Sequence, residues 1–341
     1  MKKNQFNNDK LFFHTEKLRK VLQGEVINPI VYELSLSGVC NCKCGYCCCQ
    51  NYNNNQMLSI EDINRLVSQL KNNALAITIT GGGEPFMNPH ITYCIKELKK
   101  NHLSVGIISN GLLIKSDDIP IIIENASFIR ISLDTVNPKS YKEIRGVDAD
   151  LFRLKKNLQQ LSFQKKVMNS GILIGTQIVY YKQSVRDIEN TINFSKETGI
   201  DFIQIRPIDN VPHTEIRQNS RDLLVHFKEL NYLKEKYSTP EFQVIINDKF
   251  DELHLQNVKK EYYQCLGANF TAAVGHDMDL YFCCANIGNP VFSLGNLRQE
   301  SLNKLLKTKK RKEMMEHICS EYCQTQCRNH KMNKILYQLS S

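Results

Sequence analysis

Six cysteines lie within the ten residues from Cys40 to Cys49. Cys40, Cys44 and Cys47 have the spacing C-x3-C-x2-C, and Tyr46 stands directly before the third. Cysteine thiolates are the usual ligands of iron–sulfur clusters, and three on one short loop can hold three irons of a 4Fe-4S cube. The fourth iron would then be open to a small molecule that carries an amine and a carboxylate. A zinc knuckle or a disulfide staple is the alternative, because zinc also binds thiolates at short spacing.

A glycine-rich turn follows the apolar stretch Ala74–Thr80 and has the sequence Gly81-Gly82-Gly83-Glu84-Pro85. Because glycine has no side chain, its backbone carbonyls can approach a ligand closely. Such carbonyls suit an ammonium group, and Glu84 would add negative charge beside it. A tight turn without a ligand is the alternative, although a turn alone needs fewer glycines.

Apolar stretches of strand character alternate with segments of helical spacing. The strands lie near residues 31, 75, 104, 128, 173 and 202. Strands separated by helices form a parallel sheet with right-handed crossovers. Six such units fit a partial barrel better than a closed eight-stranded one. We therefore expect an α/β fold with a partial (β/α)6 barrel, whose binding cleft lies at the carboxyl ends of the strands.

The pattern changes after the sixth strand, and three parts are expected. Residues 1–30 form an amino-terminal helical lid, with a helix over Asp9–Leu22. Residues 31–240 form the barrel, and residues 241–341 form a small cysteine-rich extension that begins with a strand over Phe242–Ile246.

Several helices are predicted from local signals. Ser59 and Asp62 have the spacing of a capping box before an apolar periodic segment. Further helices are predicted over Ser220–Tyr237 and Glu300–Glu316. The densest basic run, Lys307–Lys312, falls within the second of these and is interpreted as a solvated helix face.

Composition narrows the class of protein. The chain has 341 residues, with 42% hydrophobic and 23% charged residues, which is ordinary globular usage. The amino terminus has no apolar run typical of an export signal, and no stretch is long enough to span a membrane. With 13 cysteines, we expect reduced thiols that bind metals in the cytoplasm. The net charge of +9 is scattered, so nucleic-acid binding is not expected.

Short polar side chains stand where strands end. Asn110 follows the third strand, and Ser132 and Asp134 follow the fourth. They would suit a ribose or a carboxylate, but helix caps and turns use the same residues. Other polar side chains near strand ends that could face a substrate are Gln177, Tyr180 and Arg206, although Gln204 and Arg206 could simply pair with each other.

The cysteine loop resembles that of radical SAM enzymes, whose C-x3-C-x-aromatic-C pattern is matched by Cys40, Cys44, Tyr46 and Cys47. The turn at Gly81 resembles the Gly-Gly-Glu-Pro motif of the same family and follows the loop in the same order. The resemblance implies that S-adenosylmethionine binds the open iron and is reductively cleaved to a 5'-deoxyadenosyl radical.

The resemblance also implies which residues contact the bound cofactor. Tyr141-x-x-Ile144-Arg145-Gly146 is similar to a segment whose arginine contacts the carboxylate of S-adenosylmethionine, with a surface ion pair as the alternative. Gly171-x-Leu173-x-Gly175 matches an adenine-contacting segment only in part, since Ile178 replaces the usual acidic residue. The implied cofactor-binding residues are Tyr46, Gly82, Gly83, Glu84, Asn110, Ser132, Asp134 and Arg145.

The carboxyl-terminal cysteines resemble a twitch or SPASM extension. Cys265 and Cys283 are separated by 17 residues, and Cys319-x3-Cys323-x3-Cys327 follows. A full SPASM set needs about eight ligands for two clusters, and six cysteines remain here. We therefore expect one auxiliary 4Fe-4S cluster on Cys265, Cys283 and two of the last three. Cys284 and the remaining one of those three are either spare or available to donate a hydrogen atom, and a zinc hairpin is the alternative.

The expected function is hydrogen abstraction by a radical SAM oxidoreductase or isomerase. The segment from Phe13-His14 through Pro29, which leads into Ser35-x-Ser37-Gly38-x-Cys40-Asn41, resembles radical SAM proteins found with surface-polysaccharide genes. The extension resembles that of aminocyclitol dehydrogenases, so a sugar, aminocyclitol or nucleotide-sugar is the first substrate class. A peptide of ribosomal origin is the second. A non-catalytic iron–sulfur or zinc protein is the alternative from another class. The expected electron donor is a flavodoxin or ferredoxin.

Overall fold

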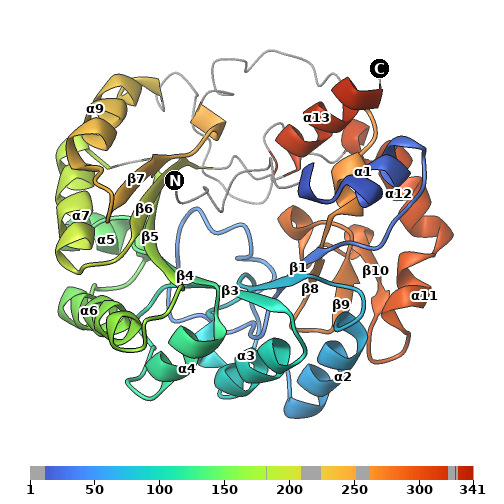
Figure 1. Ribbon diagram of the computed structural model, residues 1–341, viewed down its shortest axis with the longest axis horizontal. Coiled ribbons are helices and arrows are strands. Elements are labelled where there is room, and N and C mark those ends of the chain that lie inside the picture. Colours follow the sequence, from blue (N-terminus) through green and yellow to red (C-terminus); the bar gives the residue numbers. More distant parts are fainter. Residues whose placement is uncertain are drawn as a thin grey trace.

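The computed structural model describes residues 12–181, 183–208, 224–250, 262–321, 327 and 329–340. Its centre is one ten-stranded sheet with the order β10-β9-β8-β1-β2-β3-β4-β5-β6-β7. The sheet is strongly curved, and helices α2 to α7 lie along its outer, convex side (Figure 1).

β1 to β7 pair in parallel and in chain order. Their bounds are β1 Val31–Leu34, β2 Ala76–Ile79, β3 Ser104–Ser109, β4 Phe128–Ser132, β5 Leu173–Tyr180, β6 Phe202–Pro207 and β7 Gln243–Ile246. The six strands predicted from the sequence are β1 to β6, so the α/β partial-barrel prediction is confirmed. β7 extends the sheet by parallel pairing with β6.

Helices alternate with these strands. Their bounds are α2 Ile60–Leu70, α3 Ile91–Lys100, α4 Asp118–Asn125, α5 Pro138–Arg145, α6 Leu151–Val167, α7 Val185–Glu197 and α9 Phe227–Tyr237. The predicted capping box begins α2: Asp62 N donates to Ser59 Oγ, and Ser59 N donates to an oxygen of Asp62. Two donors at the helix start are thereby satisfied.

The strand period of two separates the two faces of the sheet. On β4, Ile129 and Ile131 are buried in the core beneath the helices, and Arg130 lies between them on the opposite, concave face. On β6, Ile203 and Ile205 are likewise buried in that core. The concave face therefore receives the polar side chains of these strands.

The extension continues the same sheet at its other edge. β8 (Thr271–Val274) pairs parallel with β1, and β9 (Asp279–Tyr281) and β10 (Ser293–Asn296) follow as antiparallel neighbours. Short helices connect them: η3 Leu266–Asn269, η4 Cys284–Asn286 and η5 Pro290–Phe292. The domain boundary near residue 240 stays a prediction, and hydrogen bonding between β6 and β7 runs across it.

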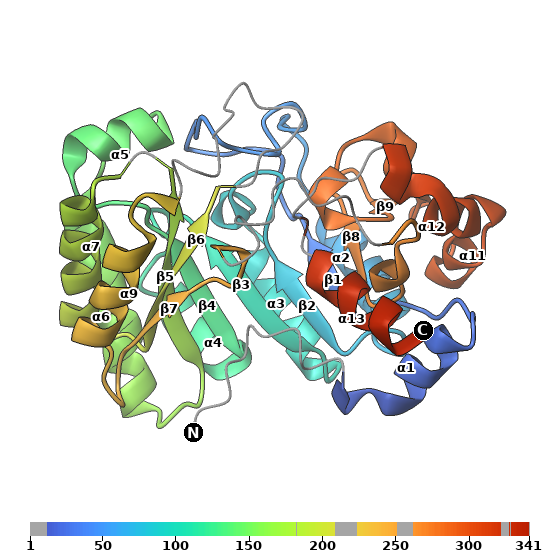
Figure 2. The same ribbon diagram turned by 90° about the horizontal axis from the view of Figure 1, so that it is seen from above.

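The remaining helices gather at the β8–β10 end of the sheet, away from α6, α7 and α9 (Figure 2). They are α1 Thr15–Leu22, α11 Leu302–Leu306, α12 Lys309–Glu321 and α13 His330–Ser340. Leu18 and Val21 of α1 pack with Phe270 and with Leu336 of α13 in a separate apolar cluster. No helix in the described ranges is long and apolar enough to cross a membrane.

Two local predictions were wrong. The single helix predicted over Glu300–Glu316 is two helices, because α11 ends at Leu306 and α12 begins at Lys309. The basic run in this region is not a uniformly solvated face. Arg311 is 2% exposed and donates hydrogen bonds to the backbone oxygens of Ile27, Ala268 and Leu306. Three carbonyl partners offset the cost of burying its charge.

Candidate radical SAM site

The cysteine loop leaves the carboxyl end of β1 and is fixed by backbone hydrogen bonds to two other segments. Gly38 N donates to Gln56 O at 2.8 Å, and Lys43 N donates to Arg145 O at 2.8 Å, at the end of α5. The loop is therefore tied to the segment before α2 and to α5. The three cysteines of the C-x3-C-x2-C motif, Cys40, Cys44 and Cys47, are all half-buried.

The described thiols of this loop separate into two kinds by their pKa. Hydrogen bonding from the Cys42 thiol lowers the pKa of Cys40, and it is the largest cause that lowers the pKa of Cys44 to about 6. Hydrogen bonding from Cys49 lowers the pKa of Cys47 in the same way. The pKa values of the donors Cys42 and Cys49 are raised. Thiolates bind metals, so this division favours the three motif cysteines as ligands.

The chemistry of this donor set suits an iron–sulfur cluster. Cys40, Cys44 and Cys47 lie on one short loop and are all half-buried, and three cysteine thiolates can hold three irons of a 4Fe-4S cube.

A buried network holds the aromatic residue of the loop. Tyr46 donates its hydroxyl to Asp134 Oδ2 at 2.6 Å, and the same oxygen lies 2.8 Å from Arg145 Nε. Arg145 also donates to Cys44 Sγ at 3.3 Å and to the backbone oxygen of Ser132. Burial raises the pKa of Tyr46. The predicted alternative for Arg145, a surface ion pair, is wrong, because its side chain is only 5% exposed.

The glycine turn packs directly against the backbone of the cysteine loop. Gly83 N donates to Ser37 O at 2.6 Å, and Glu84 N donates to Val39 O at 2.8 Å. A Cβ added at Gly83 would lie 2.0 Å from Val39 O, and Gly82 has a φ of +76°. Glycine is required at Gly83 by the close approach of the two backbones and is favoured at Gly82 by the positive φ.

Glu84 connects this turn to the end of β3. One carboxylate oxygen accepts from Ser109 Oγ at 2.6 Å, and the other accepts from Asn110 N at 2.8 Å. Asn110 Nδ2 in turn donates to Asn41 Oδ1, within the cysteine loop, at 2.6 Å. Burial raises the pKa of Glu84. Glu84 and Asn110 therefore hold together the cysteine loop, the glycine turn and the end of β3.

Gly175, in the segment compared with adenine-contacting sequences, has a packing role. A Cβ at this position would lie 2.3 Å from the Phe202 ring. A Cβ at Gly171 would meet nothing within 4 Å. Close packing of strands β5 and β6 is thus sufficient to require Gly175.

Sequence reasoning missed His276, which lies in the turn after β8. Its Nδ1 is 3.2 Å from Ser35 Oγ, and its ring packs at a tilt of 34° against Tyr52 with centroids 4.1 Å apart. Its Nε2 is buried and makes no hydrogen bond in the structure as described. A Cβ at Gly38 would lie 2.7 Å from that nitrogen. His276 therefore packs against the base of the cysteine loop, although no local motif marks it.

The carboxyl-terminal cysteines are described only in part. Cys265 is buried, and Asn333 Nδ2 lies 3.6 Å from its sulfur. Hydrogen bonding to Cys283 is the largest cause that raises the pKa of Cys284, and the nearby charges of Cys327 and Cys48 add to it. Cys48, on the amino-terminal loop, thus lies near this group. The Cys319 side chain and Cys323 lie outside the described residues. Cys94 is in the apolar core beneath the helices, as predicted.

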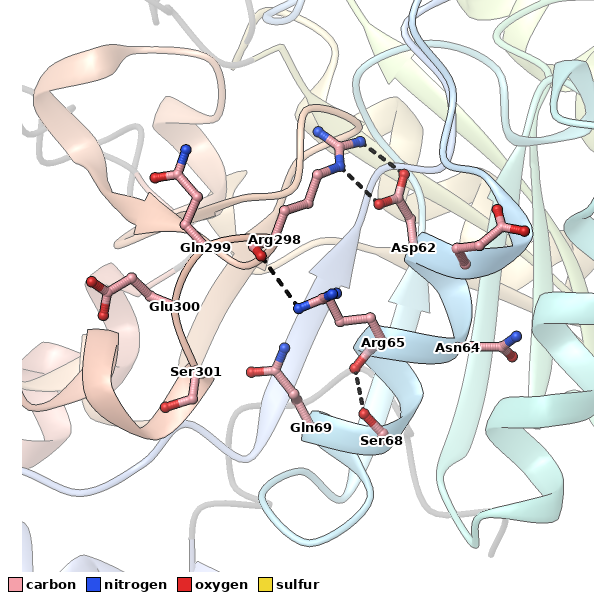
Figure 3. Close-up of a pocket in the computed structure, with 10 residues that line it drawn as sticks. Asp62, Asn64, Arg65, Ser68, Gln69, Arg298, Gln299, Glu300 and Ser301 are labelled. Carbon is pink, nitrogen blue, oxygen red and sulfur yellow. Dashed lines mark hydrogen bonds and ion pairs between the residues drawn. The ribbon is translucent and has the colours of Figure 1, made fainter.

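A polar hollow lies between α2 and residues 298–301 (Figure 3). Its volume is about 680 Å³. Arg298 crosses it to donate two hydrogen bonds of 2.8 Å to the carboxylate of Asp62, and Arg65 donates to Arg298 O. These contacts join the extension to the first helix of the barrel.

Comparisons with known proteins agree with this geometry. The family model "Radical SAM superfamily" matches residues 34–195, and the SPASM model, "Iron-sulfur cluster-binding domain", matches residues 265–329. A probable GTP 3',8-cyclase of Methanococcus vannielii is 25% identical over 191 residues, 54% of this chain and 62% of that protein. The GTP 3',8-cyclase of Clostridium perfringens strain 13 is 27% identical over 216 residues, 59% of this chain and 63% of that protein. The chain spans less than two thirds of these curated relatives.

Solved structures share the fold. The crystal structure of Streptococcus suis SuiB bound to precursor peptide SuiA has a TM-score of 0.70 and 19% identity, covering 96% of this chain and 79% of SuiB. Native anSMEcpe with bound AdoMet and Kp18Cys peptide has a TM-score of 0.62 and 18% identity, covering 84% of this chain and 83% of that one. The chain therefore contains a radical SAM domain, whose cofactors are a 4Fe-4S cluster and S-adenosylmethionine, and a SPASM-type domain for an auxiliary iron–sulfur cluster.

Proposed function

We propose that this protein reductively cleaves S-adenosylmethionine and abstracts a hydrogen atom from a small hydroxyl-bearing substrate, namely a sugar, an aminocyclitol or a nucleotide-sugar. When bound, the cluster and S-adenosylmethionine supply the 5'-deoxyadenosyl radical. The observation that carries the proposal is that the loop with Cys40, Cys44 and Cys47 leaves β1 inside the matched radical SAM region and is held there by Arg145 and by the Gly83–Glu84 turn. Three thiolates leave one iron of a cube open.

The residues around the loop would position the cofactor rather than react. Tyr46, Asp134 and Arg145 hold the loop through buried hydrogen bonds and an ion pair. Gly82 and Gly83 let the backbone of the turn come close to the loop. Together these buried contacts would fix the position of the loop.

The substrate class is supported by polar side chains on the concave face of β4 to β6 and by the curated relatives. Those relatives are named for GTP, a phosphorylated small molecule. Hydrogen abstraction would lead to oxidation if the auxiliary cluster accepts an electron, or to epimerisation if a thiol returns a hydrogen atom. A flavodoxin or ferredoxin remains the predicted electron donor.

A peptide is the second candidate substrate. The observation in its favour is that the fold of 96% of this chain matches SuiB in a structure bound to a precursor peptide. The two candidates differ in what must enter the barrel, a whole small molecule or one side chain of an extended chain.

The test of cleavage uses anaerobically reconstituted protein with dithionite and S-adenosylmethionine. We expect release of 5'-deoxyadenosine by the natural protein and its loss in Cys44→Ala. Cys94→Ala is the matched control, because Cys94 is a buried cysteine on α3 and is not part of the cysteine loop. Iron-loaded natural protein that releases no 5'-deoxyadenosine would contradict catalysis and favour a non-catalytic electron-transfer protein.

Iron counting tests the second site. Cys265→Ala should lose about four irons, one cubic cluster, and should keep the ability to cleave S-adenosylmethionine. Cys44→Ala should lose a similar amount of iron together with cleavage. If both variants lost the same iron and the same activity, the assignment of two separate sites would be wrong.

A further inference from the structure

Cys265, the first cysteine of the extension, is contacted by two helices that follow it in the chain. Its backbone N donates to Met315 O of α12 at 2.9 Å. Its sulfur accepts a hydrogen bond from Asn333 Nδ2 of α13 at 3.6 Å. This contact is longer than an N–H···O bond because sulfur is a larger atom than oxygen. The position of the Cys265 sulfur is thus tied to α13.

The other end of the Asn333 amide fixes its orientation. Asn333 Oδ1 accepts from Gly267 N at 2.7 Å, and a backbone N–H can only donate. The oxygen must therefore face Gly267, and the NH2 group must face Cys265. The bond to Gly267 alone would attach α13 to η3, so the NH2 group is free to serve another purpose at the sulfur.

This pair of side chains is shielded from solvent. Asn333 is 0% exposed and Cys265 is 4% exposed. Gly267 allows α13 to pack closely on η3, because a Cβ there would lie 2.9 Å from Asn329 Cβ. A hydrogen bond is electrostatically stronger in such an interior than in water. The N–H dipole of Asn333 therefore acts on the sulfur with little screening.

The surroundings of the sulfurs suit thiolate ligands of a cluster. The iron–sulfur cluster-binding model begins at Cys265 and ends at residue 329, four residues before Asn333. Cys283, the other expected ligand whose surroundings are described, also has an N–H donor at its sulfur, from Ala285 N at 3.4 Å. N–H groups that face the sulfurs are favourable where those sulfurs carry negative charge. Asn333 therefore adds a donor from outside the matched segment.

A donor at this sulfur has an effect on reduction that follows from charge. A cluster gains one negative charge when it is reduced, and its sulfur ligands share that charge. An N–H group that faces one of these sulfurs stabilises the reduced form more than the oxidised form. Hydrogen bonds to the sulfurs and solvent exposure are among the factors that set the reduction potential of such clusters. The amino-terminal end of α13, near which Asn333 lies, adds positive potential in the same direction.

We propose that Asn333 raises the reduction potential of the auxiliary cluster through its hydrogen bond to the sulfur of Cys265. Asn333 is a positioning residue, because it acts on the cluster through a ligand. The consequence for catalysis rests on the proposed function. A higher potential favours the transfer of one electron from the substrate radical to the cluster, with release of one proton to solvent, and so favours oxidation over epimerisation.

The experiment is an anaerobic redox titration followed by electron paramagnetic resonance. It uses reconstituted Cys44→Ala protein, which should hold only the auxiliary cluster. Adding Asn333→Leu should lower the equilibrium constant for reduction about tenfold, which is about 59 mV for a one-electron couple. The matched control adds Asn269→Leu instead, because Asn269 is also buried and its amide pairs with Ile27 N and Leu266 O. This control should keep the potential of Cys44→Ala, and an equal potential in both double variants would overturn the proposal.

A second measurement needs no substitution at Asn333, so it stands even if Asn333→Leu does not fold. Cys44→Ala protein is made with asparagine that carries nitrogen-15 in its side-chain amide. Pulsed electron paramagnetic resonance of the reduced cluster should show coupling to a labelled nitrogen, and absence of that coupling would refute the hydrogen bond. Cys44→Ala protein that holds no iron would refute the inference as well. Cleavage of S-adenosylmethionine is measured separately on the natural protein, and its failure would refute the proposed function without changing the potential.

Discussion

The buried pair of Asp134 and Arg145 gives the most demanding test of the site geometry. Asp134 is 0% exposed, and all its contacts come from other elements. Its Oδ1 accepts from Val179 N at 2.8 Å, and its Oδ2 accepts from the Tyr46 hydroxyl beside Arg145 Nε. In Asp134→Asn, asparagine has nearly the same shape as aspartate, keeps an oxygen that accepts from Val179 N, and tolerates the backbone φ of +63°. The substitution removes the charge that Arg145 faces, and an NH2 donor replaces the oxygen that accepts from Tyr46.

The expected loss of stability is large. Removing one partner of a buried ion pair leaves the other charge uncompensated and costs about 3–5 kcal/mol. The side chains of Arg145 and Asp134 are 5% and 0% exposed, so solvent screens this pair little. The matched control is Glu197→Gln. Its pair with Lys155 has a similar nitrogen–oxygen distance of 2.9 Å but exposed fractions of 62% and 39%, and such pairs contribute about 0–1 kcal/mol.

The measurement is urea unfolding under anaerobic conditions, followed by circular dichroism at neutral pH. Asp134→Asn should lower the free energy of unfolding by at least about 3 kcal/mol, and Glu197→Gln by no more than about 1 kcal/mol. If the two variants lose the same small amount, the buried network does not hold the cysteine loop in the way described. A loss in Glu197→Gln as large as that in Asp134→Asn would point to a general effect of removing acidic groups.

Two further predictions use single residues with matched controls. Gly83→Ala should destabilise the protein and lower its iron content, because the new methyl group would lie 2.0 Å from Val39 O. In the control Gly171→Ala the methyl group meets open space, so the free energy of unfolding should change by less than about 0.5 kcal/mol. Equal iron content in the two variants would refute the close approach at Gly83. Burial lowers the pKa of His276 below its ordinary value of 6.5. Below pH 6.5 the unfolded chain therefore binds a proton that the folded protein does not bind. The free energy of unfolding falls as the pH drops through 6.5 toward the pKa of the folded state. The difference in unfolding free energy between pH 7.5 and pH 5.5 should therefore shrink in His276→Asn but not in the exposed control His102→Asn, and an equal change in both would contradict the assignment.

Local signals explain what the sequence predicted. The six strands and the capping box at Ser59 follow from apolar periodicity and from residues three positions apart. The cysteine and glycine motifs are also contiguous. What could not be predicted depends on pairs distant in the chain. Tyr46 and Asp134 are 88 positions apart, and Ser35 and His276 are 241 apart. Arg311 was misjudged because its partners are backbone oxygens, which no sequence pattern marks.

The pairing of β8 with β1 gives the extension a direct part in forming the site. β1 carries the cysteine loop, and without β8 it would be an edge strand with unpaired backbone groups. Val31 N donates to Phe270 O, and Ser35 N donates to Val274 O at 2.9 Å, so the extension supports β1 along its whole length. The same pairing brings His276 against the base of the loop. Because both edges of β1 are paired, the loop leaves a fixed strand, and the extension contributes to the geometry of the first cluster as well as holding the second.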